Sequence, residues 1–272
     1  MKRLTALLTL TVLLVAADAT AQTFITLACP GARETVPQGV NNRGDVVGMC
    51  YWDDGIERAF IYRDGTYTFI GVPGAVEAQA HGLNGRGDVV GSFHDSNYNE
   101  HGFLYRNGEI TVIDVPAAHA TAWAINDRGT ILGFYMPYDV PVNRGFIWSK
   151  GRLTYFDFPG AIITNTRGIN NAGAIVGDYV VEEQPNLGFV YRDGVFSTLE
   201  PAGAIPADID NSGDMLVRGL AGCYIQTRTG VIPIAVPGAL ATGCYSLSDS
   251  GYVTGNYTTP DGRNLGFLML RK

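Results

Sequence analysis

The chain has 272 residues, 46% of them hydrophobic and 17% charged, and it carries a net charge of −7. This composition supports a folded core and excludes an intrinsically disordered protein, and the acidic balance without a basic cluster argues against nucleic acid and anionic lipid as partners. Glycine occurs 35 times, nearly twice its ordinary usage of ~7%, and this excess favours tight turns over a helix-rich enzyme.

The N-terminus has the pattern of a signal peptide. Two basic residues precede an apolar run over 4–17, and Ala19-Thr20-Ala21 has the small-x-small form that a signal peptidase accepts. The run is shorter than the ~20 residues that a membrane span needs, and no second run of this kind follows it. We therefore predict a signal peptide over 1–21, a single mature domain over 22–272, no membrane span, and export to the periplasm or the extracellular space.

The four cysteines form two pairs with equal spacing. An even number of cysteines in an exported chain favours disulfides over metal thiolates. The gap from Cys29 to Cys50 equals the gap from Cys223 to Cys244. This spacing favours the pairs Cys29–Cys50 and Cys223–Cys244, although four cysteines allow three pairings and the sequence leaves the choice open.

One unit is repeated along the mature chain. It opens with a motif close to G-[IL]-N-x-x-G-[DT]-[VI]-[VL]-G and, after a variable loop, closes with a segment close to G-F-[LIV]-[YW]-x-x-G-x-[LIF]-T-x-[IF]-x-[VF]-P-G-A. The period is about 42 residues. The last copy stops at Lys272 without its final third, and residues 22–38 supply that third at the other end of the chain. The motif begins at Gly39, Gly82, Ala124, Gly168, Asp208 and Ser246.

Each unit is expected to contain four short strands. The runs 45–48, 59–62 and 67–70 are rich in β-branched and aromatic residues and are bounded by glycines. Asp64-Gly65 separates two of these runs and suits a two-residue type I′ turn. Asn41-Asn42-Arg43-Gly44 suits a longer turn, in which the asparagine side chain bonds its own backbone.

Units of this size with four strands are typical of propeller blades. Splitting one blade between the two termini pairs the ends of the chain and leaves no exposed strand edge at the seam. We predict an all-β fold, a six-bladed β-propeller with four short strands per blade, its ring closed by pairing of the N-terminal strand with the C-terminal blade. A β-solenoid is the alternative, but a solenoid needs capping ends instead of exchanged ones.

The repeat resembles the bacterial extracellular HAF repeat family. Units of that family carry a G-I-N-x-x-G-x-[VI]-x-G core followed by H-[AG]-F-x-[YW], and residues 82–91 and 101–105 follow this pattern here. Only the unit with His101 keeps the histidine. The resemblance implies a secreted or cell-surface, propeller-like protein and implies no particular activity.

The loops between the second and third strands of the units vary while their surroundings repeat. Equivalent loops of a propeller gather on one face, and variable loops on a rigid scaffold carry function. Aromatic rings among Asp, Asn and Glu are typical of sites for neutral sugars, because the rings stack on C–H patches and the acids accept hydroxyl protons. The predicted ligand-binding residues are Trp52, Asp53, Asp54, Tyr98, Tyr138 and Glu182.

Several other motifs are interpreted as structural. The Arg-Gly-Asp tripeptides at 43–45 and 86–88 belong to the repeat's own turn and do not indicate an adhesion motif. His81 and His101 occupy positions where other units carry arginine, so we interpret them as polar side chains that bond between strands and predict no metal site. The aromatic residues just before the loops are expected to pack between blades.

We predict an exported, non-enzymatic repeat protein that binds a carbohydrate or a protein partner through these loops, as a monomer without a cofactor. No nucleophile-elbow, zinc-protease, Walker or dinucleotide-binding fingerprint is present. One alternative is a polysaccharide hydrolase or lyase whose carboxylates converge in the channel, for which Asp114, Asp157 and Glu200 share one repeat position. We favour an outward or turn-capping role for them. The other alternative is a structural component of the envelope or matrix.

Overall fold

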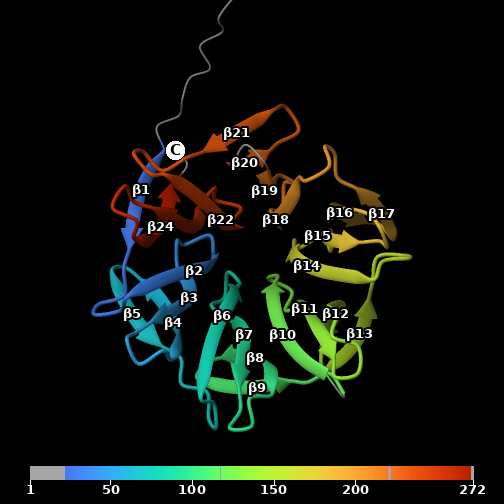
Figure 1. Ribbon diagram of the computed structural model, residues 1–272, viewed down its shortest axis with the longest axis horizontal. Coiled ribbons are helices and arrows are strands. Elements are labelled where there is room, and N and C mark those ends of the chain that lie inside the picture. The colour runs from blue at the N-terminus through green and yellow to red at the C-terminus, as the bar shows by residue number, and fades with distance from the viewer. Residues whose placement is uncertain (1–21, 117, 220–221, 271–272) are drawn as a thin grey trace, which may run out of the picture.

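The computed structural model describes residues 22–116, 118–219 and 222–270, and the predicted signal peptide lies outside them. These residues form six antiparallel sheets of four strands, arranged as blades around one axis (Figure 1). The six-bladed β-propeller is thereby confirmed. No helix in the described ranges is long and apolar enough to cross a membrane.

The strands follow each other from the axis outward in every blade. Blade 1 contains β2 (Glu34–Val40), β3 (Val46–Tyr51), β4 (Glu57–Arg63) and β5 (Thr66–Phe69). Blade 2 contains β6 (Glu77–Leu83), β7 (Val89–His94), β8 (Glu100–Arg106) and β9 (Glu109–Ile113). Blade 3 contains β10 (Ala118–Ile125), β11 (Ile131–Pro137), β12 (Arg144–Ser149) and β13 (Arg152–Phe156).

The remaining blades repeat this order, and the last one combines both ends of the chain. Blade 4 contains β14 (Ile163–Ile169), β15 (Ile175–Val180), β16 (Leu187–Arg192) and β17 (Val195–Thr198). Blade 5 contains β18 (Ile205–Ile209), β19 (Met215–Gly219), β20 (Gly222–Gln226) and β21 (Val231–Ile234). Blade 6 contains β22 (Ala241–Leu247), β23 (Val253–Thr258), β24 (Asn264–Leu270) and β1 (Thr23–Leu27).

Blade 6 closes the ring as predicted, with its last strand supplied by the N-terminal end of the chain. β1 pairs antiparallel with β24, from Thr23 opposite Leu270 to Leu27 opposite Gly266, and forms the outermost strand of this blade. The ring of Phe24 meets the ring of the fully buried Phe267 edge-on, with centroids 5.6 Å apart. The pairing covers the edge of β24, which blade 6 would otherwise expose, and gives this blade four strands like the others.

Both predicted disulfides are present, and both join blade 6 to a neighbour. Cys29, which follows β1, is bonded to Cys50 in β3 of blade 1. Cys223 in β20 of blade 5 is bonded to Cys244 in β22. The blade assembled from the two chain ends is thus covalently linked on each side. Disulfides of this kind are typical of an oxidising compartment.

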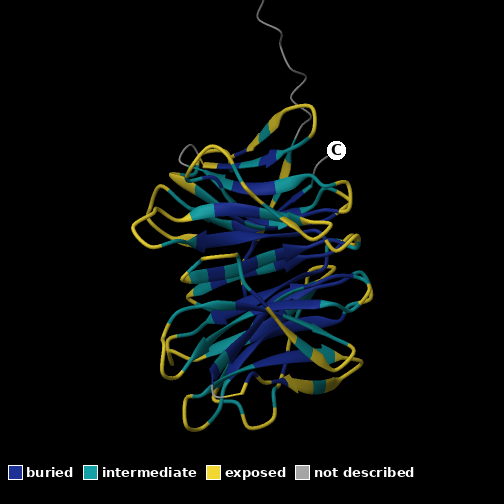
Figure 2. Ribbon diagram, turned by 90° about the vertical axis from the view of Figure 1, so that its right-hand side faces the viewer, coloured by how far each residue is buried: buried dark blue, intermediate teal, exposed yellow. Residues whose placement is uncertain are grey.

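The core lies between neighbouring blades. One cluster joins Val90 and Leu104 of blade 2 to Ala120, Ile131 and Phe146 of blade 3. Burial is concentrated in the three inner strands of each blade, whereas the exposed residues lie in loops, in turns and along the outermost strands (Figure 2). Each blade except blade 5 carries a fully buried phenylalanine in its third strand. These residues are Phe60, Phe103, Phe146, Phe189 and Phe267.

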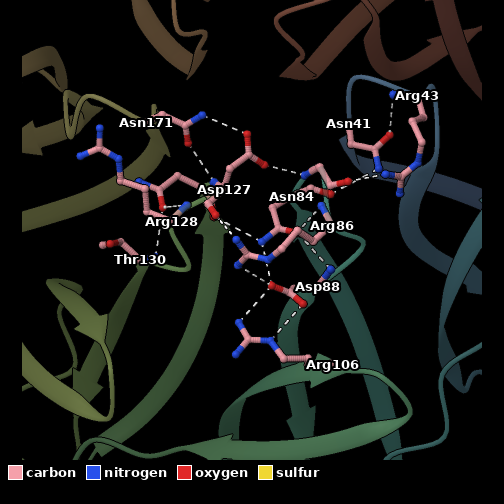
Figure 3. Close-up of polar contacts among 12 residues, drawn as sticks. Asn41, Arg43, Asn84, Arg86, Asp88, Arg106, Asp127, Arg128, Thr130 and Asn171 are labelled. Atoms are coloured by element: carbon pink, nitrogen blue, oxygen red, sulfur yellow. Dashed lines mark hydrogen bonds and ion pairs between the residues drawn. The ribbon is translucent and has the colours of Figure 1, made fainter.

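The Asn-x-x-Gly turns connect adjacent blades (Figure 3). The Asn84 side chain accepts the backbone N–H groups of Arg86 and Asp88, and its Nδ2 donates to the carbonyl of Asn126 in the next blade at 3.3 Å. Asn41 makes the same bonds within its own turn and to Asn84. Four of the six units carry asparagine at this position, where the side chain both shapes the turn and bridges two blades.

The Arg-Gly-Asp tripeptides belong to these turns, as interpreted from the sequence. Asp88 is 5% exposed and accepts from Arg86 at 2.8 Å and from Arg106 at 3.0 Å. These hydrogen bonds hold the pKa of Asp88 down at about 2 although burial opposes this. A carboxylate occupied in this way is not displayed for a partner.

Asp210 replaces the turn asparagine in blade 5 and offers a test of this network. Burial raises the pKa of Asp210, and its Oδ1 accepts from Ser212 and Asp214 as asparagine does elsewhere. We expect Asp210→Asn to raise the free energy of unfolding by about 1 kcal/mol, because the new amide can donate to the Ser248 carbonyl and the buried charge is removed. Urea denaturation measures the change. The reverse substitution Asn170→Asp is the control and should destabilise, and a destabilised Asp210→Asn would contradict the role of the network.

Candidate functional site

The variable loops lie on one face of the propeller. In each blade the chain crosses from the second to the third strand on the same side, called the loop face, and the Asn-x-x-Gly turns lie on the opposite side, called the turn face. The loops of the loop face span 52–56, 95–99, 138–143, 181–186 and 259–263.

The predicted ligand-binding residues are spread over four blades. In blade 1, Trp52 is half-buried, with its ring edge-on to Phe69 at 5.4 Å and the Arg58 guanidinium 4.8 Å from its centroid. Arg58 also forms an ion pair with Asp54. The predicted residues Trp52 and Asp54 therefore both contact Arg58. Asp53 and Glu182 are exposed.

Tyr98 and Tyr138 present the most open aromatic rings among the predicted residues, at 70% and 58% exposure. They come from neighbouring blades. The Tyr98 ring lies 6.5 Å from the ring of His94, and His119 at the start of β10 contacts Tyr138 and the backbone just after the Tyr98 loop. The His119 ring meets Tyr138 at 5.0 Å, and its Nδ1 accepts the backbone N–H of Glu100, two residues after Tyr98. We call Tyr98, His119 and Tyr138 the tyrosine cluster.

The loop that carries Tyr98 is held from inside by Asp95. Its carboxylate accepts the backbone N–H groups of Asn97 and Asn99 at 2.8 and 2.9 Å. These bonds lower the pKa of Asp95 to about 2. Tyr98 has φ +59°, in the left-handed region that tyrosine rarely adopts. The loop therefore holds an exposed ring in a fixed, unfavourable backbone geometry.

Carboxylates far outnumber basic side chains at the loop face, which restricts the charge of any ligand. An anionic polymer would be repelled from this face, whereas neutral and cationic ligands would not. Its basic residues are Arg33, Arg58, Arg144 and Arg263. Its acidic residues are Glu34, Asp53, Asp54, Glu57, Glu77, Asp95, Glu100, Asp114, Asp139, Asp157, Glu182, Glu183, Glu200 and Asp261.

The aromatic residues before the loops pack inside the molecule. Tyr179 is 5% exposed and stacks on Phe158 with centroids 3.6 Å apart, and Phe93 is 7% exposed and stacks on His101. Tyr51 differs, because the register places Cys50 at the position of Phe93 and turns Tyr51 to the other face of its sheet. Tyr179 and Phe93 both belong to clusters that include residues of the preceding blade, so packing between blades accounts for these two rings as predicted.

The three carboxylates considered for a channel site lie after the outermost strands. Asp114 follows β9 and its Oδ1 is 2.6 Å from Nδ1 of His101. Asp157 follows β13 and pairs with Arg144 at 3.4 Å, and Glu200 follows β17. The outward role is confirmed for Asp114 and Asp157, and these strands do not face the axis (Figure 1).

The channel is lined by residues that the sequence did not single out together. The innermost strand of every blade contains a β-bulge, and a bulge re-aims the side chain of the extra residue. The bulge residues are Gln38, His81, Trp123, Arg167, Ala207 and Tyr245. All of them except Ala207 border the channel cavity.

His81 bonds to the neighbouring strand as predicted, and it also lines the channel. Its Nε2 lies 3.3 Å from Ser92 Oγ on the neighbouring strand, as a strand-bonding residue would. Its ring, however, stacks on Trp123 at 4.6 Å inside the channel, and Arg167 approaches Trp123 at 5.5 Å. The signal that could have revealed this set is variability: the residue before the motif's first position differs in every unit.

Asp208, which borders the channel, makes the folding stability depend on pH. It replaces the first glycine of the motif, and burial raises its pKa to about 6 although Ser246 and the Leu247 N–H donate to it. The folded-state pKa lies above the unfolded value. Folding stability therefore falls by about 3 kcal/mol as pH rises from about 4 to about 6, and it stays level above that.

Asp208→Asn should remove this dependence. The stability difference between variant and wild type, measured by urea denaturation, is expected to grow in favour of the variant between about pH 4 and pH 7. Contributions of the other carboxylates cancel in this difference. A difference that stays constant with pH would show that Asp208 titrates normally.

Comparisons with known proteins identify the fold and no family. No protein-family model matches the chain, and a comparison with curated proteins finds no match. Virginiamycin B lyase from Staphylococcus aureus, solved with quinupristin, is similar over 92% of this chain and 100% of its own, at 14% identity and a TM-score of 0.54. The Aleuria aurantia lectin, solved with α-methyl-L-fucoside, is similar over 91% and 90%, at 11% identity and a TM-score of 0.51.

A third similar structure is the β-propeller domain of the Trilobed protease from Pyrococcus furiosus. It covers 87% of this chain and 81% of its own, at 12% identity and a TM-score of 0.56. The shared feature is the propeller. At these identities the likeness extends to the fold alone, since one fold hosts many functions.

Proposed function

We propose that this protein is an exported, non-enzymatic binding protein that recognises a neutral saccharide through its loop face. The observation that carries the proposal is the tyrosine cluster, in which two exposed rings stand on the loops of adjacent blades and His119 contacts the Tyr138 ring and the backbone just after the Tyr98 loop. Tyrosine rings bind the C–H faces of sugars, and nearby carboxylates accept their hydroxyl protons. Trp52, Asp53, Asp54 and Glu182 would extend the contact on neighbouring blades.

The charge of the loop face supports a neutral ligand over an anionic polysaccharide, because its carboxylates are poorly balanced by basic residues. The lectin similarity is compatible with saccharide binding, although the identity of 11% carries only the fold. Export is supported by the signal-peptide pattern and by the disulfides. Membership of the HAF repeat family and a bacterial origin remain predictions from the motif.

A thermal-shift screen against neutral oligosaccharides tests the proposal. A ligand that binds only the folded state raises the melting temperature. We expect a saturable shift that Tyr98→Ala combined with Tyr138→Ala abolishes, with affinity falling at least about tenfold, since an aromatic contact contributes roughly 1 kcal/mol or more.

Tyr155→Ala is the matched control, because Tyr155 is 57% exposed and belongs to the outermost strand β13 and not to a variable loop. It should leave the shift unchanged. If no neutral saccharide shifts the melting temperature, the proposal fails and a protein partner or a structural role in the envelope becomes the better account.

A further inference from the structure

A second site, separate from the loop face, lies at the turn-face end of the channel. A cavity of about 90 Å³ is bordered there by the turns between the first and second strands of all six blades, and by the bulge residues His81, Trp123, Arg167 and Tyr245. Figure 3 shows part of this wall, with Asn84, Asp127 and Asn171 reaching from blade to blade.

The wall of this cavity is held by hydrogen bonds that pass from each blade to the next. Backbone N–H groups donate to the side-chain oxygens of Asp127, Asn171, Asn211 and Asp249, each on the following blade, at 2.7 to 2.9 Å. Asn42 of blade 1 donates to Asp249 of blade 6 at 3.0 Å, and Asn41 Nδ2 donates to the Asn84 carbonyl of blade 2 at 3.3 Å, which completes the circle. The polar groups around the cavity are therefore fixed in position before any ligand binds.

The cavity carries an excess of negative charge. Within the described ranges, none of its four carboxylates pairs with a basic side chain, and their hydrogen bonds come from neutral amides and hydroxyls. The cavity's one basic side chain, Arg167, is bound by its Nε to the buried Asp178 at 2.7 Å. The four carboxylates belong to Asp127, Asp208, Asp210 and Asp249.

His81 leaves one hydrogen-bonding position open in this wall. It is 6% exposed, and its Nδ1 is buried without a hydrogen-bond partner among the described residues. Burial lowers the pKa of His81 to about 3, so the ring is neutral at neutral pH. When its Nε2–H donates to Ser92, the unpaired Nδ1 is an acceptor, and a buried acceptor without a donor is costly.

We propose that this cavity binds the ammonium group of a linear aliphatic amine, which donates a hydrogen bond to His81 Nδ1 and is held by the four surrounding carboxylates. The volume selects the shape of the ligand, because it is smaller than the cavity of roughly 150 Å³ that admits a benzene ring. The end of an unbranched chain enters it, whereas a sugar or aromatic ring does not.

Arg218 limits how far the amine enters. It lies in β19 opposite Ile205, on the loop-face side of the cavity, and forms no ion pair with a described residue. Burial and the nearby Arg167 lower its pKa. A second cation is repelled at this depth, so one ammonium group binds from the turn face.

Calorimetric titration of the purified chain, residues 22–272, with 1,4-diaminobutane tests this site. Butane-1,4-diol, at the same ionic strength, is the uncharged control. We expect saturable binding of one diamine per chain and no binding of the diol. His81→Ala should weaken diamine binding at least about tenfold, and blade 5 already carries alanine (Ala207) at this position.

Asp210→Asn provides a second variant that preserves the fold, because four other turns carry asparagine there, and it should weaken binding several-fold. Tyr98→Ala should leave diamine binding unchanged, so this site and the saccharide site can fail independently. Equal binding of diol and diamine, or unchanged binding in His81→Ala and Asp210→Asn, would overturn the proposal. The same titration can then compare a lysine side chain in a peptide with a free polyamine as the source of the ammonium group.

Discussion

Gly91→Ala is expected to prevent this chain from folding. A Cβ at Gly91 would lie 1.9 Å from the carbonyl oxygen of Gln79 and 2.7 Å from the ring of Phe103. The first contact is with the backbone of the paired strand β6, which cannot move away without breaking the ladder that joins β6 to β7. We expect a loss of at least ~4 kcal/mol, beyond the usual range for single substitutions.

The measurement is the yield of folded protein and its melting by circular dichroism. Gly71→Ala is the matched control, because a Cβ at Gly71 meets nothing within 4 Å, and it should melt like wild type. A Gly91→Ala variant that folds normally would contradict the close strand packing on which the blade geometry depends.

Removing either disulfide is expected to have the second largest effect. Each bond joins blade 6 to one neighbour and closes a loop of 21 residues. Such a constraint on the unfolded chain is worth about 3 kcal/mol. Cys29→Ala with Cys50→Ala, and Cys223→Ala with Cys244→Ala, should each lower the free energy of unfolding by about that amount.

Urea denaturation of the two double variants measures this loss, and peptide mapping without reductant verifies the pairing. Native-state hydrogen exchange adds a structural readout. Because β1 is the outermost strand of blade 6 and Cys29 lies two residues after it, its amides should lose protection first when Cys29–Cys50 is absent. Variants as stable as wild type would show that pairing of β1 with β24 alone closes the ring.

The architecture was predictable because one pattern is repeated. The motif glycines fixed the number of blades, and the incomplete last unit together with residues 22–38 predicted that β1 completes blade 6. The equal spacing of Cys29–Cys50 and Cys223–Cys244 favoured the correct pairs because the same step along the repeat joins neighbouring blades.

The channel was less predictable. A strand pattern assumes that side chains alternate between faces, and the bulge at Trp123 breaks this alternation without changing the composition around it. Tyr51 was grouped wrongly for a different reason: it stands three residues after Gly48, whereas Phe93 stands two residues after Gly91, so Cys50 is the equivalent of Phe93. The contact of Trp52 with Arg58 depends on loop geometry, which the repeat does not encode because these loops vary.

Hydrogen–deuterium exchange in the presence of the saccharide that gives the largest thermal shift tests the central claim, that ligands bind at the variable loops. The account predicts increased protection over 95–99 and 138–143, the loops of the tyrosine cluster, and none at the turns 41–45 and 84–88 of the opposite face. Protection confined to those turns, or equal protection in Tyr98→Ala combined with Tyr138→Ala, would contradict it.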